Sequence, residues 1–505
     1  MSNEAQANTS TQEFSPLRSA LWPIHGYEMK KFLPMSFLMF FILYVYTMIR
    51  DLKDVFVRTY AVGGGAELIP QLKLWFVMPA AFLLVAVYAA LLDKFGFKKS
   101  FYIMITSFLA FFAVFILFLY PNRDAIHPGL ATVRAMQASW PAFFYWIIPC
   151  ITNWSYTLFY IMAELWGTMA ISSLFWQFAY QITMKNEVKR YFGLYSVIGN
   201  LGGILSASLL KWLSRAFQGD SFVYASIFSS IGCGLVVMAI YWYMNAVTLK
   251  DPKLFDPSQI KGKKKKAKAG IMDGIKMLGQ SRYVLMICLI VICYGVGVNF
   301  VEVIWKKCVE IYFNYNKNAV AEMQANLSIV TGIITIVMSL VGQNILRKTK
   351  WRTSALIPAL VLTIFGAVFF GVVLYGKFAS PTILGVSYFA IATWLGMVID
   401  AATKGVKYCL FDATKNMAYL PLDEETKTKG QAAVEVIGGR AGKAGASTIQ
   451  MVLTNVIAAG SAIMSHVVTI SICFAATAIA WIYSVFNLSK KYEAKLVENA
   501  SQEQE

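Results

Sequence analysis

This sequence has few charged residues for its length, and few of the residue types that build metal or redox centres. Only 14% of its 505 residues are Asp, Glu, Lys or Arg, whereas a soluble domain carries roughly 25%. Its three histidines, His25, His127 and His466, form no cluster. Its seven cysteines include no C-x-x-C pair and mostly lie in apolar stretches, which is typical of small hydrophobic side chains. The sequence therefore predicts no metal site, no cofactor and no disulfide framework.

What the sequence has in abundance is apolar side chains. Hydrophobic types make up 58% of the chain. Apolar runs of about twenty residues recur along its length, a pattern typical of transmembrane helices. The composition excludes a soluble enzyme, a disordered chain and a nucleic-acid-binding protein, although a net charge of +18 alone is compatible with nucleic acid. Residues 1–17 are polar, so no cleaved secretory signal is expected.

Twelve segments predict an all-α polytopic membrane protein. The fourth contains no Pro or Gly between Asn153 and Gly167, and we expect it to form one long helix. The predicted helices cover residues 33–58, 68–92, 100–120, 140–181, 188–215, 222–247, 283–305, 320–346, 353–375, 383–412, 430–459 and 461–487.

The order of these segments indicates two six-helix halves, an arrangement typical of transporters that rock around a central binding site. Segment 187–207 aligns weakly with segment 426–446 at a constant offset, which supports an internal repeat. The predicted parts are an N-terminal tail 1–31, a six-helix half 32–247, a basic linker 248–282, a second six-helix half 283–488 and a C-terminal tail 489–505.

The distribution of positive charge predicts the orientation in the membrane. Most of the 45 Lys and Arg residues fall in the tails and the even-numbered loops, including the Lys261–Lys268 block of the central loop. Short cytoplasmic loops carry such an excess, so both termini are predicted to be cytoplasmic. We expect the block to set topology and to contact anionic lipid headgroups, rather than to form a regulatory site.

Several charged residues fall within the predicted spans, where ionisation costs at least ~2.5–3.5 kcal/mol and a charge usually faces a bundle interior or a wet cavity. Lys73 has a structural alternative, namely extension to the membrane interface. Glu302 precedes Lys306 by one helical turn, so the two can form a local ion pair. Asp400 stands in the same relation to Lys404. The candidates are Lys73, Glu164, Glu302, Asp400, Lys404, Lys407, Glu435, Arg440 and Lys443.

Arg440 and Lys443 are one turn apart in the stretch 438–446, whose small residues leave room beside two cations. The stretch resembles a phosphate loop. However, its spacing differs, no strand precedes it, and Ala444 stands where Ser or Thr would bind magnesium. We therefore reject a P-loop nucleotide hydrolase.

The cations within the spans indicate that a polyanion crosses the membrane. Lys73, Arg440 and Lys443 can balance the phosphate charges of a nucleotide. Lys53 and Lys407 can add to them. Acids in the same cavity would couple transport to protons, or would hold the empty site neutral by pairing with the cations.

At these residues the chain resembles the ATP/ADP translocase family of nucleotide transporters, found in obligate intracellular bacteria and plastids. The similarity extends over nearly the whole chain. The motifs that carry it are Arg50-Asp51-x-Lys53-Asp54, Gly65-Ala66-Glu67-x-Ile69-Pro70-x-x-Lys73-x-Trp75, Ala163-Glu164-Leu165-Trp166-Gly167, Leu174-Phe175-Trp176 with Gln181-Ile182-Thr183, Val301-Glu302-Val303-x-Trp305-Lys306, Lys407-Tyr408-x-x-Phe411-Asp412, Met417-Ala418-Tyr419-x-Pro421-Leu422-Asp423 and Gly442-Lys443.

The resemblance implies a major-facilitator-like fold and transport that depends on two lysines and two glutamates. These four residues carry over onto Lys73, Glu164, Glu302 and Lys443. Asn200 lies in the small-residue helix that pairs with the Lys443 helix, and it is a weaker candidate for contact with the base or ribose.

The chain departs from the members that exchange ATP and ADP. Leu52 stands where they commonly have Thr, and Arg58 stands where they have an apolar residue. Ala444 replaces a Ser, and Asp400 falls where an Asn is usual. An added acid in a translocation helix is what proton coupling would need.

Three transport hypotheses follow. The first is import of nucleoside triphosphates by ATP/ADP-type exchange. The second is proton-coupled symport of nucleoside triphosphates. The third is carriage of another phosphorylated organic anion. A polytopic membrane enzyme would be a different class, but the sequence offers no nucleophile–base pair or metal cluster for it. The expected partners are nucleotides, protons or phosphate, and membrane lipids, and the chain is expected to act as a monomer.

Overall fold

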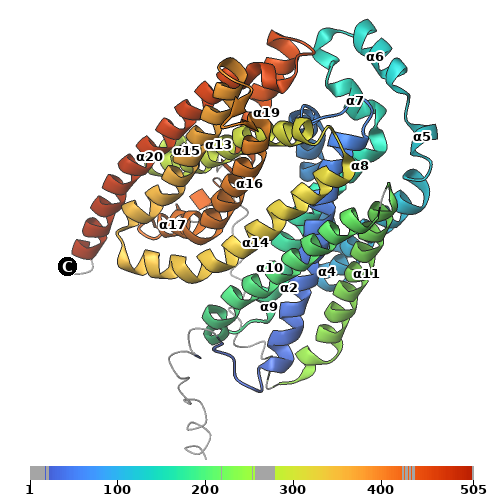
Figure 1. Cartoon of the computed structure of the whole chain (residues 1–505). Helices are drawn as coiled ribbons and strands as arrows, with labels where there is room; N and C mark the ends of the chain where they lie inside the picture. Colours follow the sequence, from blue (N-terminus) through green and yellow to red (C-terminus); the bar gives the residue numbers. More distant parts are fainter. Residues whose placement is uncertain are drawn as a thin grey trace, which may run out of the picture.

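The computed structural model describes residues 18, 22–217, 219–252, 254–255, 279–423, 426, 430–431, 434 and 438–502 (Figure 1). These residues are almost entirely helical, and the sheet found among them is one antiparallel hairpin, β1 (Thr382–Ile383) with β2 (Val386–Ser387). The Lys261–Lys268 block, to which we assigned a topological role, lies outside the described residues.

The N-terminal bundle comprises α2 (Met29–Val55), η1 (Phe56–Tyr60), α3 (Leu68–Gln71), η2 (Leu72–Val77), α4 (Met78–Val114), η3 (Phe115–Leu119), α5 (Arg123–Ile126), α6 (Leu130–Ser139), η4 (Ala142–Phe144), α7 (Ile147–Thr152), α8 (Trp154–Trp166), η5 (Gly167–Phe175), α9 (Trp176–Ile182), α10 (Lys185–Ala216), α11 (Ser221–Ala246) and η6 (Thr248–Lys250).

The C-terminal bundle comprises α13 (Arg282–Tyr312), α14 (Lys317–Lys348), α15 (Trp351–Phe378), the hairpin, α16 (Tyr388–Val406), η8 (Lys407–Phe411), α17 (Asp412–Met417), α19 (Gly439–Met451), η10 (Val452–Ile457), η11 (Ile463–His466) and α20 (Val467–Gln502). The segments η4, η6 and η11 are 3-10 helices, and the other η segments are π-helices.

Ten helical segments in the described part of the chain are long and apolar enough to cross a membrane. One of them, Leu68–Leu119, is 52 residues long. It is interrupted at Gly96, whose φ of 70° is a left-handed conformation that glycine adopts readily, so this segment holds two of the predicted spans. The shorter apolar helix Ala444–Ile457 lies where the eleventh span is predicted. The structure is thus consistent with twelve crossings, and the all-α membrane fold class is confirmed.

The prediction of one long helix over residues 140–181 is wrong. The chain forms η4 and α7 first and then bends at Asn153 before α8 begins. The Asn153 carboxamide accepts a hydrogen bond from the Val62 amide (2.9 Å) and donates to the Val62 carbonyl (3.0 Å). It also donates to the Pro149 carbonyl (2.8 Å). Such side-chain bonds to backbone groups compete with helix formation, and they tie the bend to the turn after η1.

The two bundles meet along α10 and α14, and along α3 and η2 against α19. Figure 1 shows that they come together near α5, α6 and α7 and diverge toward the other end. We call these the α6 end and the opposite end. At the α6 end Asn318 of α14 donates to the carbonyls of Ser214 (2.7 Å) and Phe217 (2.8 Å), which lie at the end of α10.

An aromatic core fixes the part of α2 that leads into η1. The Phe56 ring lies 4.9 Å from Phe159, 5.3 Å from Tyr156 and 5.5 Å from Phe115, measured between ring centroids. All four side chains are buried, and aromatic pairs in such geometries add ~0.5–1.5 kcal/mol beyond area burial. This packing holds the charged face of α2 in a fixed position.

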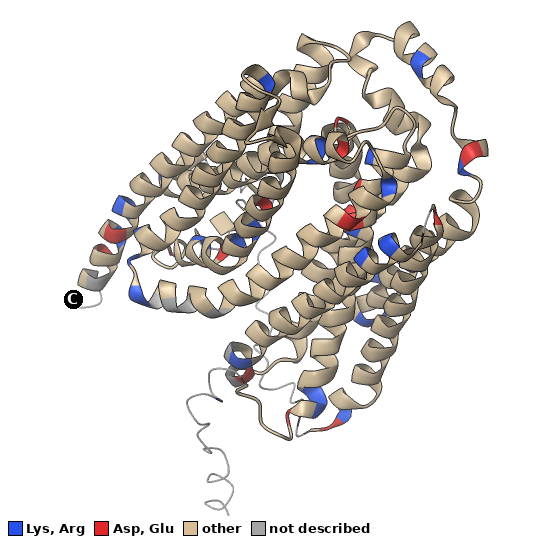
Figure 2. Cartoon of the chain, viewed as in Figure 1, with Lys and Arg blue, Asp and Glu red and all other residues tan. Residues whose placement is uncertain are grey.

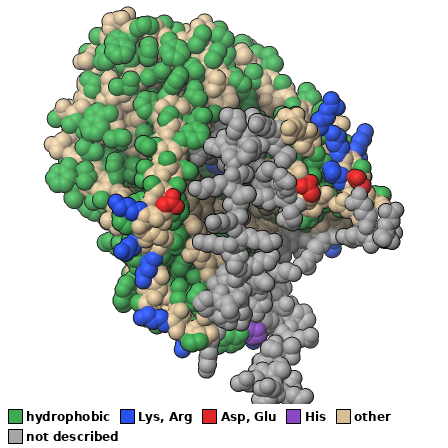
Figure 3. All heavy atoms as spheres, turned by 180° about the vertical axis from the view of Figure 1, so that it is seen from behind, with side chains coloured by type: hydrophobic (Ala, Val, Ile, Leu, Met, Phe, Trp, Pro, Cys, Tyr) green, Lys and Arg blue, Asp and Glu red, His purple; other side chains and the backbone are tan. Residues whose placement is uncertain are grey.

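Apolar side chains cover much of the outside of the molecule. Figure 3 shows a broad hydrophobic surface from behind, with Lys and Arg gathered at its edges. On α20, for example, Ile479 is 69% exposed and Tyr483 66% exposed. A surface of this kind suits contact with lipid rather than water.

Candidate functional site

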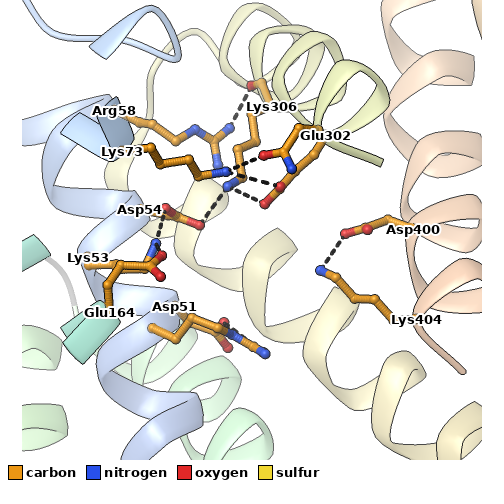
Figure 4. A network of polar contacts seen from close by, with 12 residues as sticks. Asp51, Lys53, Asp54, Arg58, Lys73, Glu164, Glu302, Lys306, Asp400 and Lys404 are labelled. Carbon is orange, nitrogen blue, oxygen red and sulfur yellow. Dashed lines mark hydrogen bonds and ion pairs between the residues drawn. The ribbon is translucent and has the colours of Figure 1, made fainter. Parts of the chain in front are cut away.

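Most charged side chains lie near the ends of the helices, but one group lies inside the molecule where the two bundles meet (Figure 2). Figure 4 shows this group from close by. We call it the charged network. Its members are Arg50, Asp51, Lys53, Asp54 and Arg58 of α2 and η1, Glu67 and Lys73 of α3 and η2, Glu164 of α8, Glu302, Lys306, Lys307 and Glu310 of α13, and Asp400 and Lys404 of α16.

A chain of alternating charges joins α2 to α13 at the centre of the network. Lys53 Nζ lies 2.9 Å from Asp54 Oδ1, and Asp54 Oδ2 lies 2.8 Å from Lys306 Nζ. Lys306 Nζ also contacts Glu302 Oε1 at 2.7 Å, one helical turn away on α13. The predicted pairing of Glu302 with Lys306 is therefore observed, but as one link in a longer chain that crosses between the bundles.

Lys73 and Glu164 attach to the two ends of this chain. Lys73 Nζ lies 3.5 Å from Glu302 Oε2 and donates to Asn299 Oδ1 at 2.7 Å. Its alternative role, extension to the membrane interface, is wrong, because the side chain turns toward the C-terminal bundle. On the other side, Glu164 Oε1 lies 3.1 Å from Lys53 Nζ, and that ammonium group is 3.9 Å from the Tyr160 ring centroid. We call Lys53–Glu164 and Lys73–Glu302 the central pairs.

A second, more deeply buried layer of ion pairs lies toward the α6 end. Arg58 Nε contacts Glu310 Oε1 at 2.9 Å, and neither side chain has measurable exposure. Arg58 also donates to the Lys306 carbonyl at 2.6 Å. Lys307 Nζ contacts Glu67 Oε2 at 3.0 Å and Glu310 Oε2 at 3.4 Å. We call Arg58, Glu67, Lys307 and Glu310 the closed layer, because Arg58–Glu310 and Lys307–Glu67 join the two bundles and all four side chains are buried or nearly so.

Glu67 ties this closed layer to a third element. Its second carboxylate oxygen accepts a hydrogen bond from the Ile463 amide at 3.1 Å, in η11 of the C-terminal bundle. Nearby, Gln71 donates to Asn455 Oδ1 at 3.0 Å, and Asn455 donates in turn to the Phe143 carbonyl at 2.8 Å. The α6 end is therefore closed by polar contacts from several elements, and each of these contacts crosses between the bundles.

Exposure separates the central pairs from the closed layer. Side chains of Glu164, Lys73 and Glu302 retain 28%, 15% and 18% exposure, whereas those of Glu67 and Glu310 retain none. The carboxylates of the central pairs are therefore partly exposed, whereas those of the closed layer are fully buried.

The network is electrically balanced. Among the side chains that the structure describes, it contains seven cations and seven carboxylates. Unpaired charges in a membrane-embedded site are costly, and mutual pairing is how proteins tolerate them. The ion pairs among these residues thus stabilise their charges within the membrane-spanning part of the protein.

π-helical segments carry or adjoin several site residues. Lys73 lies in η2, η5 begins three residues after Glu164, and Lys407 opens η8. A π-helix is less stable than an α-helix and occurs mostly at functional sites, where the extra residue per turn redirects side chains. Helical periodicity alone therefore does not predict which way these side chains point.

The structure places the predicted site residues unequally. It brings Lys53, Lys73, Glu164 and Glu302 into one network. Asp400 pairs with Lys404 at 2.8 Å, as one of the alternatives predicted, and its side chain is 3% exposed. Figure 4 shows this pair across from the central residues.

Three further predicted residues, two cations and one amide, lie on α19 and α10. Arg440 and Lys443 belong to α19, which packs against α13 and α3, but their side chains lie outside the described residues, as does Glu435. Asn200 of α10 donates its amide to the Ser196 carbonyl of the same helix at 2.8 Å. A binding role for Arg440, Lys443 and Asn200 stays a prediction.

Sequence reasoning named Lys306 as the partner of Glu302, but it did not name as site candidates the other residues that complete the network, namely Asp51, Asp54, Arg58, Glu67, Lys307 and Glu310. They lie near the ends of the predicted helices, where charged residues are common and the cost of burying a charge in the membrane does not single them out. The available signal was their density, because Arg50, Asp54 and Arg58 recur at intervals of four residues and so share one face of α2.

Comparisons with known proteins agree with this arrangement. The sequence profile described as TLC ATP/ADP transporter matches residues 7–492. ADP,ATP carrier protein 1 of Rickettsia bellii is 39% identical over 497 residues, which cover 97% of this chain and 98% of that protein. ADP,ATP carrier protein 1 of Chlamydia muridarum is 37% identical over 511 residues, covering 98% of this chain and 94% of that protein.

Solved structures of transporters share the fold. A D-xylose–proton symporter superposes with a TM-score of 0.55 at 12% identity, covering 92% of this chain and 97% of that chain. The nucleoside transporter NupG superposes with a TM-score of 0.54 at 10% identity, covering 90% of this chain and 99% of that chain. At such low identity these similarities concern the fold alone, and they agree with the predicted major-facilitator-like architecture.

Proposed function

Because this chain belongs to the TLC ATP/ADP transporter family, it is a multi-pass membrane transporter of nucleotides and not an enzyme, and we propose that it imports nucleoside triphosphates by exchange for ADP. We place it in a bacterial inner membrane with both termini in the cytoplasm. Relatives named ADP,ATP carrier protein favour exchange over the other modes.

The observation that carries this proposal is the balanced charge of the site. Lys53 and Lys73 are each held by a partly exposed carboxylate, at 3.1 Å and 3.5 Å. Phosphate oxygens can take the place of Glu164 and Glu302 because they offer the same charge-assisted contacts. The lysines therefore have anionic partners in both the loaded and the empty site.

We further propose that Arg440 and Lys443 contribute to the same phosphate site from α19. The helix packs against α13, which carries Glu302, and against α3, which precedes Lys73. Two added cations would draw an anion into a site that is otherwise balanced. Asn200, on α10, remains a candidate for contact with the ribose or base.

Alternating access would follow from the way charges pair at the two ends. At the α6 end ion pairs cross between the bundles, as Arg58 and Glu310 do. At the opposite end they form within one bundle, as Lys31 does with Glu187 at 2.7 Å and Glu28 with Arg190 at 2.6 Å. We therefore propose that this conformation is closed to the periplasm and open toward the cytoplasm.

The pairing of Glu28 is strong enough to keep it ionised. Burial raises the pKa of the Glu28 carboxyl, but its hydrogen bonds to Arg190 and to the His25 amide outweigh burial, and the pKa lies below its ordinary value. This charge is therefore available to pair at the opposite end throughout the physiological pH range.

Proton-coupled symport of nucleoside triphosphates is the second candidate, and Asp400 is the observation that favours it. Its carboxylate is nearly buried in a span, next to Lys404. Exchange of ATP for ADP moves about one net negative charge, which costs or yields ~2.3 kcal/mol per 100 mV, whereas proton co-import would offset it. A carrier of another phosphorylated anion would use the same cations without selecting a nucleoside.

Uptake of labelled ATP into proteoliposomes tests these modes. If exchange is correct, uptake requires ADP inside the vesicles and continues when a proton uncoupler is added. Uptake into vesicles without internal nucleotide that collapses with the uncoupler would instead establish symport. Sugar phosphates that compete as well as ATP would contradict both nucleotide modes. Unchanged pH dependence in Asp400→Asn would remove the proton role of that residue.

Removal of single site charges should abolish transport without loss of the fold. We expect Glu164→Ala and Lys443→Ala each to reduce ATP uptake to background, because Glu164 holds Lys53 and Lys443 supplies phosphate binding. Membrane insertion should be unchanged. Lys94→Ala, which removes an exposed cation on α4, is the matched control. Normal uptake in either site variant would contradict its assignment.

A further inference from the structure

A second group of side chains lies beside the charged network, and it combines cations with aromatic rings. Arg50 of α2 places its guanidinium carbon 5.2 Å from the Tyr46 ring centroid. Its Nη2 donates to Ser328 Oγ of α14 at 2.8 Å and lies 3.3 Å from Asp51 Oδ1. Arg50 thus contacts both bundles, and 24% of its side chain is exposed.

Packing fixes the Tyr46 ring in place. A Cβ atom at Gly167, where η5 begins, would lie 2.6 Å from Tyr46 Cε2 and 3.1 Å from Cδ2, so glycine is needed for the ring to approach. Tyr46 therefore supports the Arg50 guanidinium from one side. Planar guanidinium groups held in this way present a flat face that can stack on aromatic rings.

The C-terminal bundle contributes an aromatic ring from across the interface. Tyr408, in η8, is 54% exposed although it lies in a membrane-spanning segment. Tyr408 belongs to a segment, η8, that packs against α14, and α14 carries the Ser328 hydroxyl that accepts the hydrogen bond from Arg50. Lys407 Nζ is 4.5 Å from the Tyr408 ring centroid, and its own charge is balanced by Asp412 at 3.4 Å.

The spacing along α2 relates this group to the central pairs. Tyr46 precedes Lys53 by seven residues, which is about 10 Å along a helix axis. The base of an extended nucleotide stands at a comparable distance from its terminal phosphates. Arg50 lies between Tyr46 and Lys53 along α2, one helical turn from Lys53.

We propose that Tyr46, Arg50 and Tyr408 form the nucleobase end of the transport site, where the base stacks between the Arg50 guanidinium and the Tyr408 ring. This inference rests on the proposed function and adds the residues that select a nucleoside over a simple polyphosphate. Base–aromatic stacking is tolerant of the base, since each base has a flat face. The proposal therefore predicts that the site discriminates strongly between a nucleotide and a simple polyphosphate, and only weakly between one base and another.

The site would also link base recognition to closure. Arg50 belongs to the N-terminal bundle and Tyr408 to the C-terminal one, so a base between them contacts both. Inorganic polyphosphate would bind Lys53 and Lys73, but it has no base to contact Arg50 and Tyr408.

The test compares labelled ATP with inorganic tripolyphosphate as a competitor, in proteoliposomes containing the full chain. Tyr408→Leu removes the aromatic face but keeps an apolar side chain. Arg50→Lys keeps the charge but removes the planar group. We expect each to raise the KM for ATP about tenfold, a loss within the range of one stacking contact. Inhibition by tripolyphosphate should not change.

Conservative and matched variants separate stacking from a structural role. Tyr408→Phe should restore the wild-type KM, because it retains the ring. Tyr483→Leu, which alters another exposed tyrosine, on α20, should behave as the wild type. An unchanged KM for ATP in both Tyr408→Leu and Arg50→Lys would overturn the inference, as would an equal loss of tripolyphosphate inhibition. Failure of the wild type to transport any nucleotide would instead overturn the proposed function.

Discussion

Glu302→Gln should lower the maximal rate of ATP uptake by at least about 100-fold and at the same time lower the KM, because removing one partner of a buried ion pair costs ~3–5 kcal/mol. Glu302 is the carboxylate shared by Lys73 and Lys306, at 3.5 Å and 2.7 Å. Lys306 keeps Asp54 as a partner, whereas Lys73 loses its one carboxylate within salt-bridge distance among the described residues. The empty site then carries an uncompensated charge.

The direction of the KM change distinguishes competition between Glu302 and phosphate for Lys73 from a general loss of structure at the site. With Glu302 neutral, no carboxylate competes with phosphate for Lys73, so the nucleotide binds more tightly and is released more slowly. Lys73→Gln should do the reverse and raise the KM, because it removes a phosphate contact while Glu302 still pairs with Lys306. Both variants should lower the rate.

Initial rates of labelled ATP uptake over a range of ATP concentrations measure both constants. Asp93→Asn, which neutralises an exposed carboxylate on α4, is the control and should match the wild type. A raised KM in Glu302→Gln would show that the carboxylate does not compete with substrate. A wild-type rate would remove Glu302 from the transport site altogether.

The sequence predicts the main outline of this protein because membrane spans are set by length and apolarity alone. Residues such as Gly96, which separates two helices, fall where the predicted segments end. The error at Asn153 has a clear cause, since that break depends on hydrogen bonds to Val62, a residue about ninety positions away. Contacts of this range leave no trace in local composition.

The site was predictable only where a charge stood out against its surroundings. Lys73 and Glu164 lie within apolar stretches, so the cost of burying them identifies them. Arg58 and Glu310 escape that argument because they lie near predicted helix ends. They are fully buried because the Arg58 side chain reaches the last turns of α13, where it contacts Glu310 and the Lys306 carbonyl, and this is a property of the tertiary fold.

The closed layer should determine which side of the transporter is open. We expect Arg58→Glu to lower ATP uptake by at least about 100-fold, because it replaces a buried ion pair with two like charges and costs at least the ~3–5 kcal/mol of a broken pair. The new carboxylate would face Glu310, with Glu67 nearby on Lys307. The conformation that closes the α6 end would then be disfavoured, and the transporter would spend little time open toward the cytoplasm.

A charge exchange tests whether the pair, rather than either residue, holds this end closed. Arg58→Glu combined with Glu310→Arg should recover at least tenfold of the lost uptake, while each single variant remains inactive, since a double-mutant cycle isolates the interaction between two groups. Recovery should be incomplete, because a glutamate at position 58 cannot donate to the Lys306 carbonyl as Arg58 does. Equal inactivity of the double and single variants would contradict the pairing argument.

The conformational claim can be measured apart from transport. Spin labels at Ala125 of α5 and at Leu384 of the hairpin report the separation of the bundles at the α6 end, in a background whose seven native cysteines are replaced. The distance between the labels should increase in Arg58→Glu and return toward the wild-type value in the exchanged pair. A distance that stays short in Arg58→Glu, together with lost uptake, would mean that Arg58 acts on the substrate and not on closure. The central pairs would then have to hold the bundles together without the closed layer.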